Sequence, residues 1–124
     1  MKKVVHTQAA PQAIGPYSQA IAANGLLFVS GQIPVNPVDG SIDTDIKKQT
    51  EQSLANVKAI LAAEGKTVAD VVKTTVFIKN MNDFAAVNEV YGSVFNENPP
   101  ARSCVEVARL PKDVLVEIEV IAVL

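Results

Sequence analysis

The sequence has few of the residues on which metal sites, disulfides and nucleophilic triads depend. Its 124 residues include one cysteine, Cys104, one histidine, His6, and no tryptophan. A zinc site needs several cysteine and histidine ligands, and a lone cysteine cannot close an internal disulfide, which fits a reducing compartment. A Ser-His-Asp triad is not expected, because its histidine could only be His6, which lies in an expected first strand. The six glycines form no G-x-G-x-x-G fingerprint, so a dinucleotide site is not expected either.

Charge and long apolar runs are also sparse. Lysine and arginine number 11 against 13 acidic residues, giving a formal net charge of -2. This is a poor electrostatic footprint for a protein that binds nucleic acid or an anionic membrane. No apolar run approaches the roughly 20 residues of a membrane helix, and the N-terminus lacks the apolar stretch of a signal peptide. We expect a soluble cytoplasmic protein.

The residues that are present suffice for a single domain spanning 1–124. Hydrophobic residues make up 48% of the chain and charged residues 19%, a balance that excludes general disorder. A chain of this length buries roughly two thirds of its unfolded surface on folding, which is enough for one core. No internal repeat, linker or low-complexity tract divides it.

Turn signals and hydrophobic periodicity predict the order of elements. Asn24-Gly25 between two apolar segments predicts a β-hairpin, and Asp39-Gly40 marks a second turn. Apolar residues recur at helical spacing over Thr44–Glu64 and Asp83–Asn96. Later strands are expected at Asp70–Lys79, Arg102–Ala108 and Val114–Val123. The order β-β-β-α-β-α-β-β predicts an α+β domain, a mixed sheet with both helices on one face.

The last expected strand indicates more than one copy of the chain. Its even-numbered residues from 116 to 122 are all apolar and share one face. The other face still carries Leu115, Ile121 and Val123. Since two short helices cover only one face of a sheet, the uncovered apolar groups favour a homo-oligomer over a monomer.

Arg102 and Glu117 are the strongest candidates for chemistry. Arg102 follows the rigid segment Asn98-Pro99-Pro100-Ala101, which fixes a guanidinium able to grip a carboxylate with two hydrogen bonds. Glu117 interrupts an apolar strand, where a carboxylate is either paired or desolvated with a raised pKa. A structural Arg-Glu ion pair, or solvent exposure of one strand face, is the alternative for both.

Three other residues have an ordinary structural role as the alternative to a functional one. Tyr17, at an expected strand start, can be core with its hydroxyl in water. Asn88 shares a helical face with aromatic residues and can be a polar group at the rim of that face. Cys104 is either a nucleophile activated by Arg102 or a small buried residue, and the second is favoured because free cysteine is commonly buried.

Several stretches of the chain match one known family. The most specific runs from Pro100 to Asp113, PARSCVEVARLPKD, and is followed by Val116-Glu117-Ile118-Glu119. The others are Ala13–Gln19, Ser30–Pro34, Asn56–Leu61, Val72–Phe77 and Phe84–Tyr91. In these stretches the sequence resembles the Rid family, the YjgF-type enamine/imine deaminases, over essentially its whole length.

The resemblance implies a fold, an assembly and a reaction. The fold is chorismate-mutase-like, and the assembly is a homotrimer with an active site in each cleft between subunits. The reaction is hydrolytic deamination of reactive 2-imino or enamine acids, 2-iminobutanoate and 2-iminopropanoate, to 2-oxo acids and ammonia. An imine carbon is already electrophilic, so no metal or cofactor is needed. The site has to hold a carboxylate, place a water and manage one proton.

The resemblance also implies roles for individual residues, carried over by position. Arg102 would bind the substrate carboxylate, and Glu117 would position or activate water. Gly31 and Cys104 would contact the ligand through their backbone groups. The remaining residues would line the cleft: Tyr17, Ser30 and Asn88. The loop 96–100 is shorter than in many members of the family, which leaves substrate size open.

Two other functions stay open at this point. A regulatory protein of purine or amino-acid metabolism would hold a small carboxylate with Arg102 but would not need Glu117. RNA cleavage, attributed to some members of the family, is disfavoured by the acidic balance of the chain and the absence of a second histidine.

Overall fold

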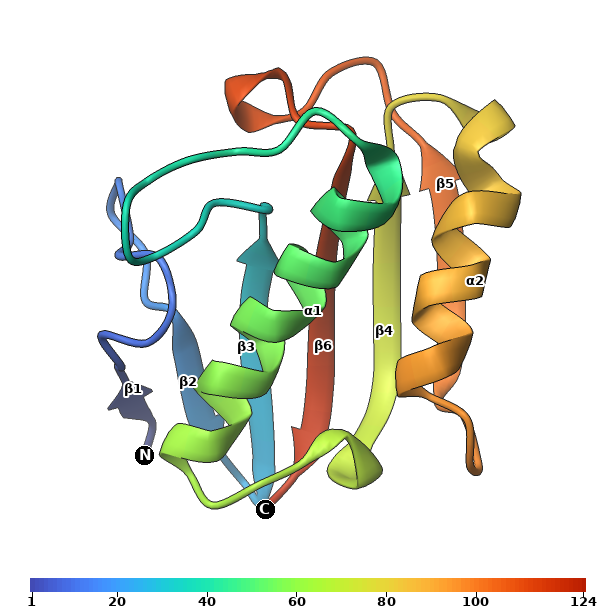
Figure 1. Ribbon diagram of the computed structural model, residues 1–124. Coiled ribbons are helices and arrows are strands. Elements are labelled where there is room, and N and C mark those ends of the chain that lie inside the picture. The colour runs from blue at the N-terminus through green and yellow to red at the C-terminus, as the bar shows by residue number, and fades with distance from the viewer.

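The computed structural model describes residues 1–124 and contains one mixed sheet covered on one face by two helices (Figure 1). The strands are β1 (Lys3–Val5), β2 (Ala20–Ala23), β3 (Leu26–Gln32), β4 (Val71–Ile78), β5 (Ala101–Glu106) and β6 (Val116–Val123). Their order across the sheet is β1-β2-β3-β6-β4-β5, antiparallel except for the parallel pair β4 and β5. The predicted mixed sheet with both helices on one face is confirmed.

The hairpin between β2 and β3 forms where the sequence predicts it. Asn24 and Gly25 have φ of 52° and 74°, the left-handed conformations that a type I′ turn requires. The preceding strand is shorter than expected, because β2 begins only at Ala20, where it pairs with Val5. Tyr17 therefore lies in a loop, and the prediction that it starts a strand is wrong. Its backbone N–H turns back to the carbonyl of Gly15 instead of joining the sheet.

Both predicted helices are confirmed, with slightly shorter bounds. In α1 (Ile46–Ala63) the side chain of Asp45 accepts a hydrogen bond from the Lys48 amide at 3.0 Å and caps the first turn. Gly65, with φ of 68°, ends the same helix, as expected for a residue just past a C-terminus. Helix α2 (Phe84–Val94) connects the parallel strands β4 and β5. No helix is long and apolar enough to cross a membrane.

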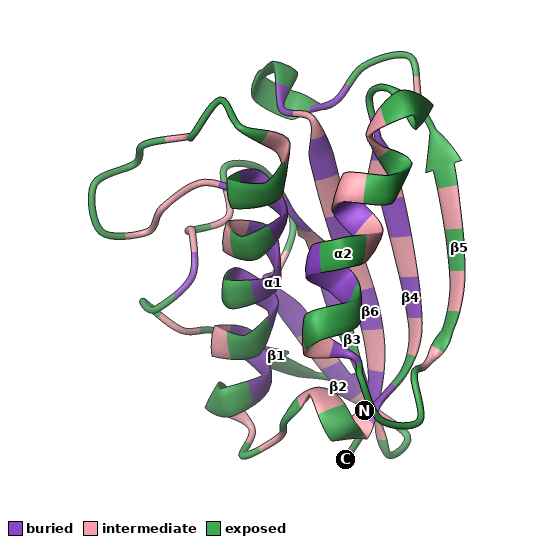
Figure 2. Cartoon of the chain, turned by 45° about the vertical axis from the view of Figure 1, so that its right-hand side comes forward, coloured by how far each residue is buried: buried purple, intermediate pink, exposed green.

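The core lies between the sheet and the two helices, as the buried inner sides of α1 and α2 in Figure 2 indicate. The even-numbered residues of β6 all face it, so their predicted common face is confirmed; they are Val116, Ile118, Val120 and Ala122. Buried polar residues of α1 form hydrogen bonds to the backbone of the neighbouring loop. Asn56, for example, donates to the carbonyls of Ile33 and Val35 at 3.1 and 3.0 Å.

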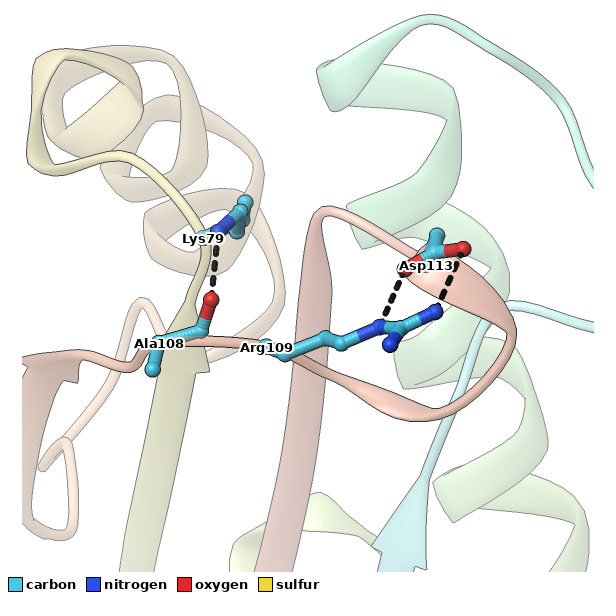
Figure 3. Close-up of polar contacts among 4 residues, drawn as sticks. All are labelled: Lys79, Ala108, Arg109 and Asp113. Atoms are coloured by element: carbon cyan, nitrogen blue, oxygen red, sulfur yellow. Dashed lines mark hydrogen bonds and ion pairs between the residues drawn. The ribbon is translucent and has the colours of Figure 1, made fainter.

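The last two strands are shorter than predicted because a structured loop separates them. β5 ends at Glu106 rather than Ala108, and β6 begins at Val116 rather than Val114. In this loop, the Ala108 carbonyl accepts a hydrogen bond from Lys79, which directly follows β4. Arg109 forms two hydrogen bonds to Asp113 at 2.8 and 3.3 Å (Figure 3). Lys112 and Asp113 both have a φ of 55°, so this loop turns sharply before it enters β6.

Candidate active site

Arg102 lies on β5 with its side chain against α2. Its Nη1 donates a hydrogen bond of 2.7 Å to Oδ1 of Asn88. Its Cζ lies 4.7 Å from the centroid of the Tyr91 ring and 5.6 Å from that of Phe84. A guanidinium in this position is held by one hydrogen bond and two aromatic contacts, while no carboxylate of the chain neutralises it. It is therefore free to bind an external carboxylate.

The three residues around Arg102 come from one face of α2. Phe84, Asn88 and Tyr91 are separated by four and three positions, so they lie along the same side of the helix. The sequence pattern indicates this shared face, but it does not indicate that the face lies against a guanidinium. That contact depends on the crossover that brings β5 beside β4 beneath the helix.

Cys104 follows Arg102 by two positions and faces the same side of β5. It is partly buried against the core. Burial raises the pKa of its thiol, and the nearby charge of Arg102 lowers it by less. The thiol is accordingly protonated near neutral pH, whereas a nucleophilic cysteine needs its thiolate. This favours the small buried residue over the nucleophile.

Glu117 lines a cleft on the other side of the sheet. The cleft has a volume of about 400 Å³ and is open to solvent. Three other residues singled out in the sequence also line it: Tyr17, Ser30 and Gly31. Tyr17 is half exposed, and Ser30 donates a hydrogen bond of 2.6 Å from Oγ to the Ser18 carbonyl. The structure thus brings together four of the predicted site residues.

Gly31 gives the Glu117 side chain its place in the cleft. A Cβ built on Gly31 would collide with the Glu117 carboxylate, lying only 2.8 Å from its Cδ and 3.1 Å from its Cγ. Real Cβ atoms essentially never come this close, so any larger residue at position 31 would displace the carboxylate. Gly31 therefore has a steric function that sequence reasoning, which gave it only backbone contacts, did not find.

The carboxylate of Glu117 has no partner within the chain. It accepts no side-chain or backbone hydrogen bond, and the three ion pairs of the protein lie elsewhere. Burial raises the pKa of Glu117, and the negative charge of Glu119 raises it further. Of the two alternatives for a carboxylate inside an apolar strand, the geometry favours partial desolvation with a raised pKa over pairing within the chain. The alternative of an Arg102–Glu117 ion pair is wrong for the single chain.

Arg102 and Glu117 lie on opposite faces of the sheet. Arg102 is the register partner of Thr74, which is fully buried and hydrogen-bonded to α2. Glu117 is the partner of Phe77, three positions further along β4. Because side chains alternate along a strand, Thr74 and Phe77 point to opposite faces. One chain therefore presents two separate half-sites, with Asn88 and Cys104 beside Arg102 and the cleft residues beside Glu117.

Sequence reasoning missed several residues of these half-sites. Glu119, Ile14 and Pro111 line the Glu117 cleft, and Tyr91 and Phe84 contact Arg102. For Glu119 a signal was available, since it follows Glu117 by two positions and so shares its face. Pro111 reaches the cleft only through the sharp turn before β6. No group of three His, Cys, Asp or Glu residues lies close enough together to hold a metal ion.

Comparison with known proteins assigns the family. The sequence model of the family described as Endoribonuclease L-PSP, which includes the YjgF and Rid proteins, matches residues 7–124. The chain belongs to this family. It is 60% identical to a RutC family protein of Haemophilus influenzae, over 99% of this chain and 98% of that protein. It is 56% identical to the 2-iminobutanoate/2-iminopropanoate deaminase of Escherichia coli K12, over 99% and 98%.

Solved structures of Rid-family relatives have the same fold. The crystal structure of Escherichia coli TdcF with bound serine superposes with a TM-score of 0.95 at 54% identity, covering 98% of each chain. A Rid family protein from Yersinia pestis, YyfA, superposes with a TM-score of 0.97 at 53% identity, covering the whole of both chains. The mixed sheet with two helices that the order of elements predicts is therefore the architecture of this family.

Proposed function

We propose that this protein hydrolyses reactive 2-imino acids, such as 2-iminobutanoate and 2-iminopropanoate, to 2-oxo acids and ammonia. The observation that carries the proposal is a pair of complementary half-sites. One presents an oriented guanidinium without a counter-ion, and the other presents a desolvated carboxylate without a donor. Relatives that match this chain at 56% identity over nearly their whole length and are named imine deaminases support the same reaction.

In this proposal a second copy of the chain completes the site. Since Arg102 and Glu117 face opposite sides of one sheet, a small imino acid cannot contact both within one chain. The face that carries Glu117 has no helix over it and leaves Phe28 and Val105 each 43% exposed. Apolar groups exposed in this way favour burial against other copies. In the homotrimer implied by the family resemblance, Arg102 of one subunit would lie beside Glu117 of the next.

The chemistry assigned to the completed site is short. Arg102 binds the carboxylate of the imino acid and directs the electrophilic C2 toward the cleft. Glu117 accepts a proton from a water as the water oxygen adds to C2, and it then gives that proton to the imine nitrogen, which leaves a neutral carbinolamine. Glu117 next takes the proton of the carbinolamine hydroxyl and delivers it to the nitrogen, so the C–N bond breaks, ammonia leaves and the C2 carbonyl forms. Each turnover consumes one water, and its raised pKa makes the Glu117 carboxylate a stronger base than an ordinary glutamate.

A competition assay tests the reaction. Threonine dehydratase generates 2-iminobutanoate, semicarbazide traps the imine, and formation of 2-oxobutanoate is followed with and without this protein. The protein is expected to divert imine from semicarbazide, whereas Arg102→Ala and Glu117→Gln are not. If the wild-type protein leaves the partition unchanged, the proposed reaction is wrong.

A mixing experiment tests the shared site. Arg102→Ala and Glu117→Gln, each inactive alone, are unfolded, mixed in equal amounts and refolded together. Random assembly then restores both residues in about a quarter of the sites if each site spans two neighbouring subunits of a cyclic oligomer. Recovery of about a quarter of the wild-type activity is expected. A mixture that stays inactive, although wild-type protein refolded in parallel regains activity, contradicts the shared site.

A small-carboxylate-binding protein without catalysis is the second candidate. The structure of TdcF with bound serine favours it, because serine carries the carboxylate that Arg102 would hold. Binding needs Arg102 but not Glu117. If Glu117→Gln abolishes hydrolysis and keeps carboxylate affinity, the enzyme is supported. If the wild-type protein binds the carboxylate and hydrolyses nothing, the binding function replaces it.

A further inference from the structure

We propose that Tyr91, itself fixed by Thr74, is a positioning residue that holds the Arg102 guanidinium in the orientation that binds carboxylate. The inference rests on the proposed function, because it takes Arg102 as the carboxylate-binding group. It goes beyond that function because two buried residues that do not contact the substrate, Tyr91 and Thr74, raise the affinity of Arg102 for carboxylate.

Arg102 needs such support because of where it lies. β5 is one of the two edge strands of the sheet and has no fully buried residue, as its colouring in Figure 2 shows. An arginine side chain carries about 2 kcal/mol of rotamer entropy. Because β5 has a neighbouring strand on one side only, no side chain of a further strand restricts these rotamers. The side chain is ordered before ligand binding only if groups on α2 fix it.

The Tyr91 ring supplies the closer of the two aromatic contacts. The Cζ of Arg102 lies 4.7 Å from the ring centroid, closer than the 5.6 Å that separates it from Phe84. At this distance the ring face attracts the cation. Tyr91 is only 6% exposed, so water does not compete for that face. Burial also raises the pKa of its hydroxyl, which keeps the ring neutral.

Thr74 and Phe95 fix the ring in turn. The hydroxyls of Thr74 and Tyr91 are 2.7 Å apart in a buried hydrogen bond, and Thr74 is fully buried on β4. The Phe95 ring packs against Tyr91 with its centroid 4.7 Å away. With its tip bonded to β4 and Phe95 packed against it, Tyr91 cannot rotate without breaking a buried hydrogen bond. Tyr91 thus links the interior strand β4 to Arg102 on the neighbouring edge strand β5 and fixes the orientation of the guanidinium.

Asn88 completes the arrangement without using up the guanidinium. It accepts one hydrogen bond from Nη1 at 2.7 Å. A guanidinium has five N–H donors, so four remain, which is enough for a two-point grip on a carboxylate. Tyr91 contacts the guanidinium through its ring face, and its hydroxyl is bonded to Thr74, so it takes none of these donors.

Four variants and one stable ligand test the inference. The ligand is 2-oxobutanoate, and its dissociation constant is measured by calorimetry together with the melting temperature of each variant. Tyr91→Leu keeps an apolar side chain but removes the ring face, and we expect binding to weaken about tenfold. Tyr91→Phe keeps the ring, and Thr74→Val frees the ring tip; each is expected to weaken binding by less than about threefold.

Phe95→Leu is the matched control. It removes the other ring of the same aromatic pair and lowers the melting temperature as Tyr91→Leu does, but it does not touch Arg102. Because the hydrogen bond to Thr74 still holds the Tyr91 ring, the affinity of this variant for 2-oxobutanoate is expected to weaken by less than about threefold, against about tenfold for Tyr91→Leu. Ligand affinity and melting temperature should therefore rank the variants differently. If Tyr91→Leu and Phe95→Leu weaken binding equally, Tyr91 is merely structural and the inference is overturned.

The outcomes also separate this inference from the proposed function. If wild-type protein binds 2-oxobutanoate but hydrolyses no imine, the proposed function fails, and the series of dissociation constants still decides the role of Tyr91. If hydrolysis is present and Tyr91→Leu binds like the control, only the positioning role fails. If wild-type protein binds no 2-oxobutanoate, the inference is overturned whether or not hydrolysis is seen.

Discussion

The two half-sites differ in whether the fold supports or disfavours the charge of their functional group. The guanidinium of Arg102 lies over an aromatic ring and donates to Asn88, so the fold fixes its orientation before any ligand binds. The carboxylate of Glu117 is desolvated beside Gly31 and faces the negative charge of Glu119. A binding group gains from being fixed in advance, whereas a base gains from being poorly stabilised in its charged form. The difference in treatment matches the difference in proposed role.

The stability of the protein depends on pH through Glu117. The pKa of Glu117 is raised in the folded protein above its value in the unfolded chain. Protonation of this group therefore favours the fold at low pH, and that contribution is lost as the pH rises through the folded pKa. Above the folded pKa the ionised Glu117 lowers the stability of the protein, while the contacts of Arg102 stabilise it. Neutralising the two residues should change stability in opposite directions.

The largest effect is expected from Glu117→Gln. Loss of a general base lowers a rate typically by about 10²- to 10⁴-fold, and imine hydrolysis should fall within that range. The melting temperature at pH 7 should stay the same or rise, because the desolvated charge is gone. The competition assay and a calorimetric scan measure the two quantities. A variant that loses activity and also melts well below wild type would show that Glu117 is a structural residue.

Arg102→Ala is expected to come next. Removing one partner of a buried charge pair costs typically about 2 to 5 kcal/mol of binding, so affinity for 2-oxobutanoate should fall by roughly 30-fold or more. The protein should remain folded but melt at a lower temperature, because Asn88 loses its donor and Tyr91 its cation. Calorimetric titration and circular dichroism check both. Normal affinity with a normal melting curve contradicts the carboxylate role.

Gly31→Ala should have an intermediate effect confined to the Glu117 side. The added methyl displaces the carboxylate, and hydrolysis should fall by about tenfold or more, since small misplacements of catalytic groups are costly. Affinity for 2-oxobutanoate should change much less, because the displaced group is the base rather than the guanidinium. Gly92→Ala on α2 is the matched control, because a Cβ there meets nothing within 4 Å. Equal losses in the two variants would exclude the steric role of Gly31.

The smallest effect is a shift in pH dependence. Glu119→Gln removes the negative charge that helps to raise the pKa of Glu117, although burial, the larger cause, remains. The Glu117 carboxyl should then ionise at lower pH, so the acid limb of the activity profile should move to lower pH while the maximal rate changes little. Rates measured across the acid range test this. A shift toward higher pH would contradict the electrostatic coupling of the two residues.

Local patterns explain why so much of the fold could be predicted. Asn24-Gly25 tolerates positive φ, and Asp45 and Gly65 have the chemistry of helix ends, so nearby residues alone decide these features. Tyr17 was misplaced because the start of β2 depends on pairing with β1, which is distant in sequence. Likewise, Pro111 reaches the cleft only through the positive-φ turn at Lys112 and Asp113. Positive φ is predicted from glycine, and neither of these residues is a glycine.

The sequence by itself determined the elements, their order and the face of each strand residue relative to its neighbours. Glu117 had to oppose Val116 and share a side with Glu119, because strand side chains alternate with a period of two. Only the tertiary structure decided that Arg102 faces the helices while Glu117 faces away from them. That outcome depends on the register of β5 against β4 and of β4 against β6, contacts between residues far apart in the chain. Long-range register has no local signature, so the separation of the two charges emerged only on folding.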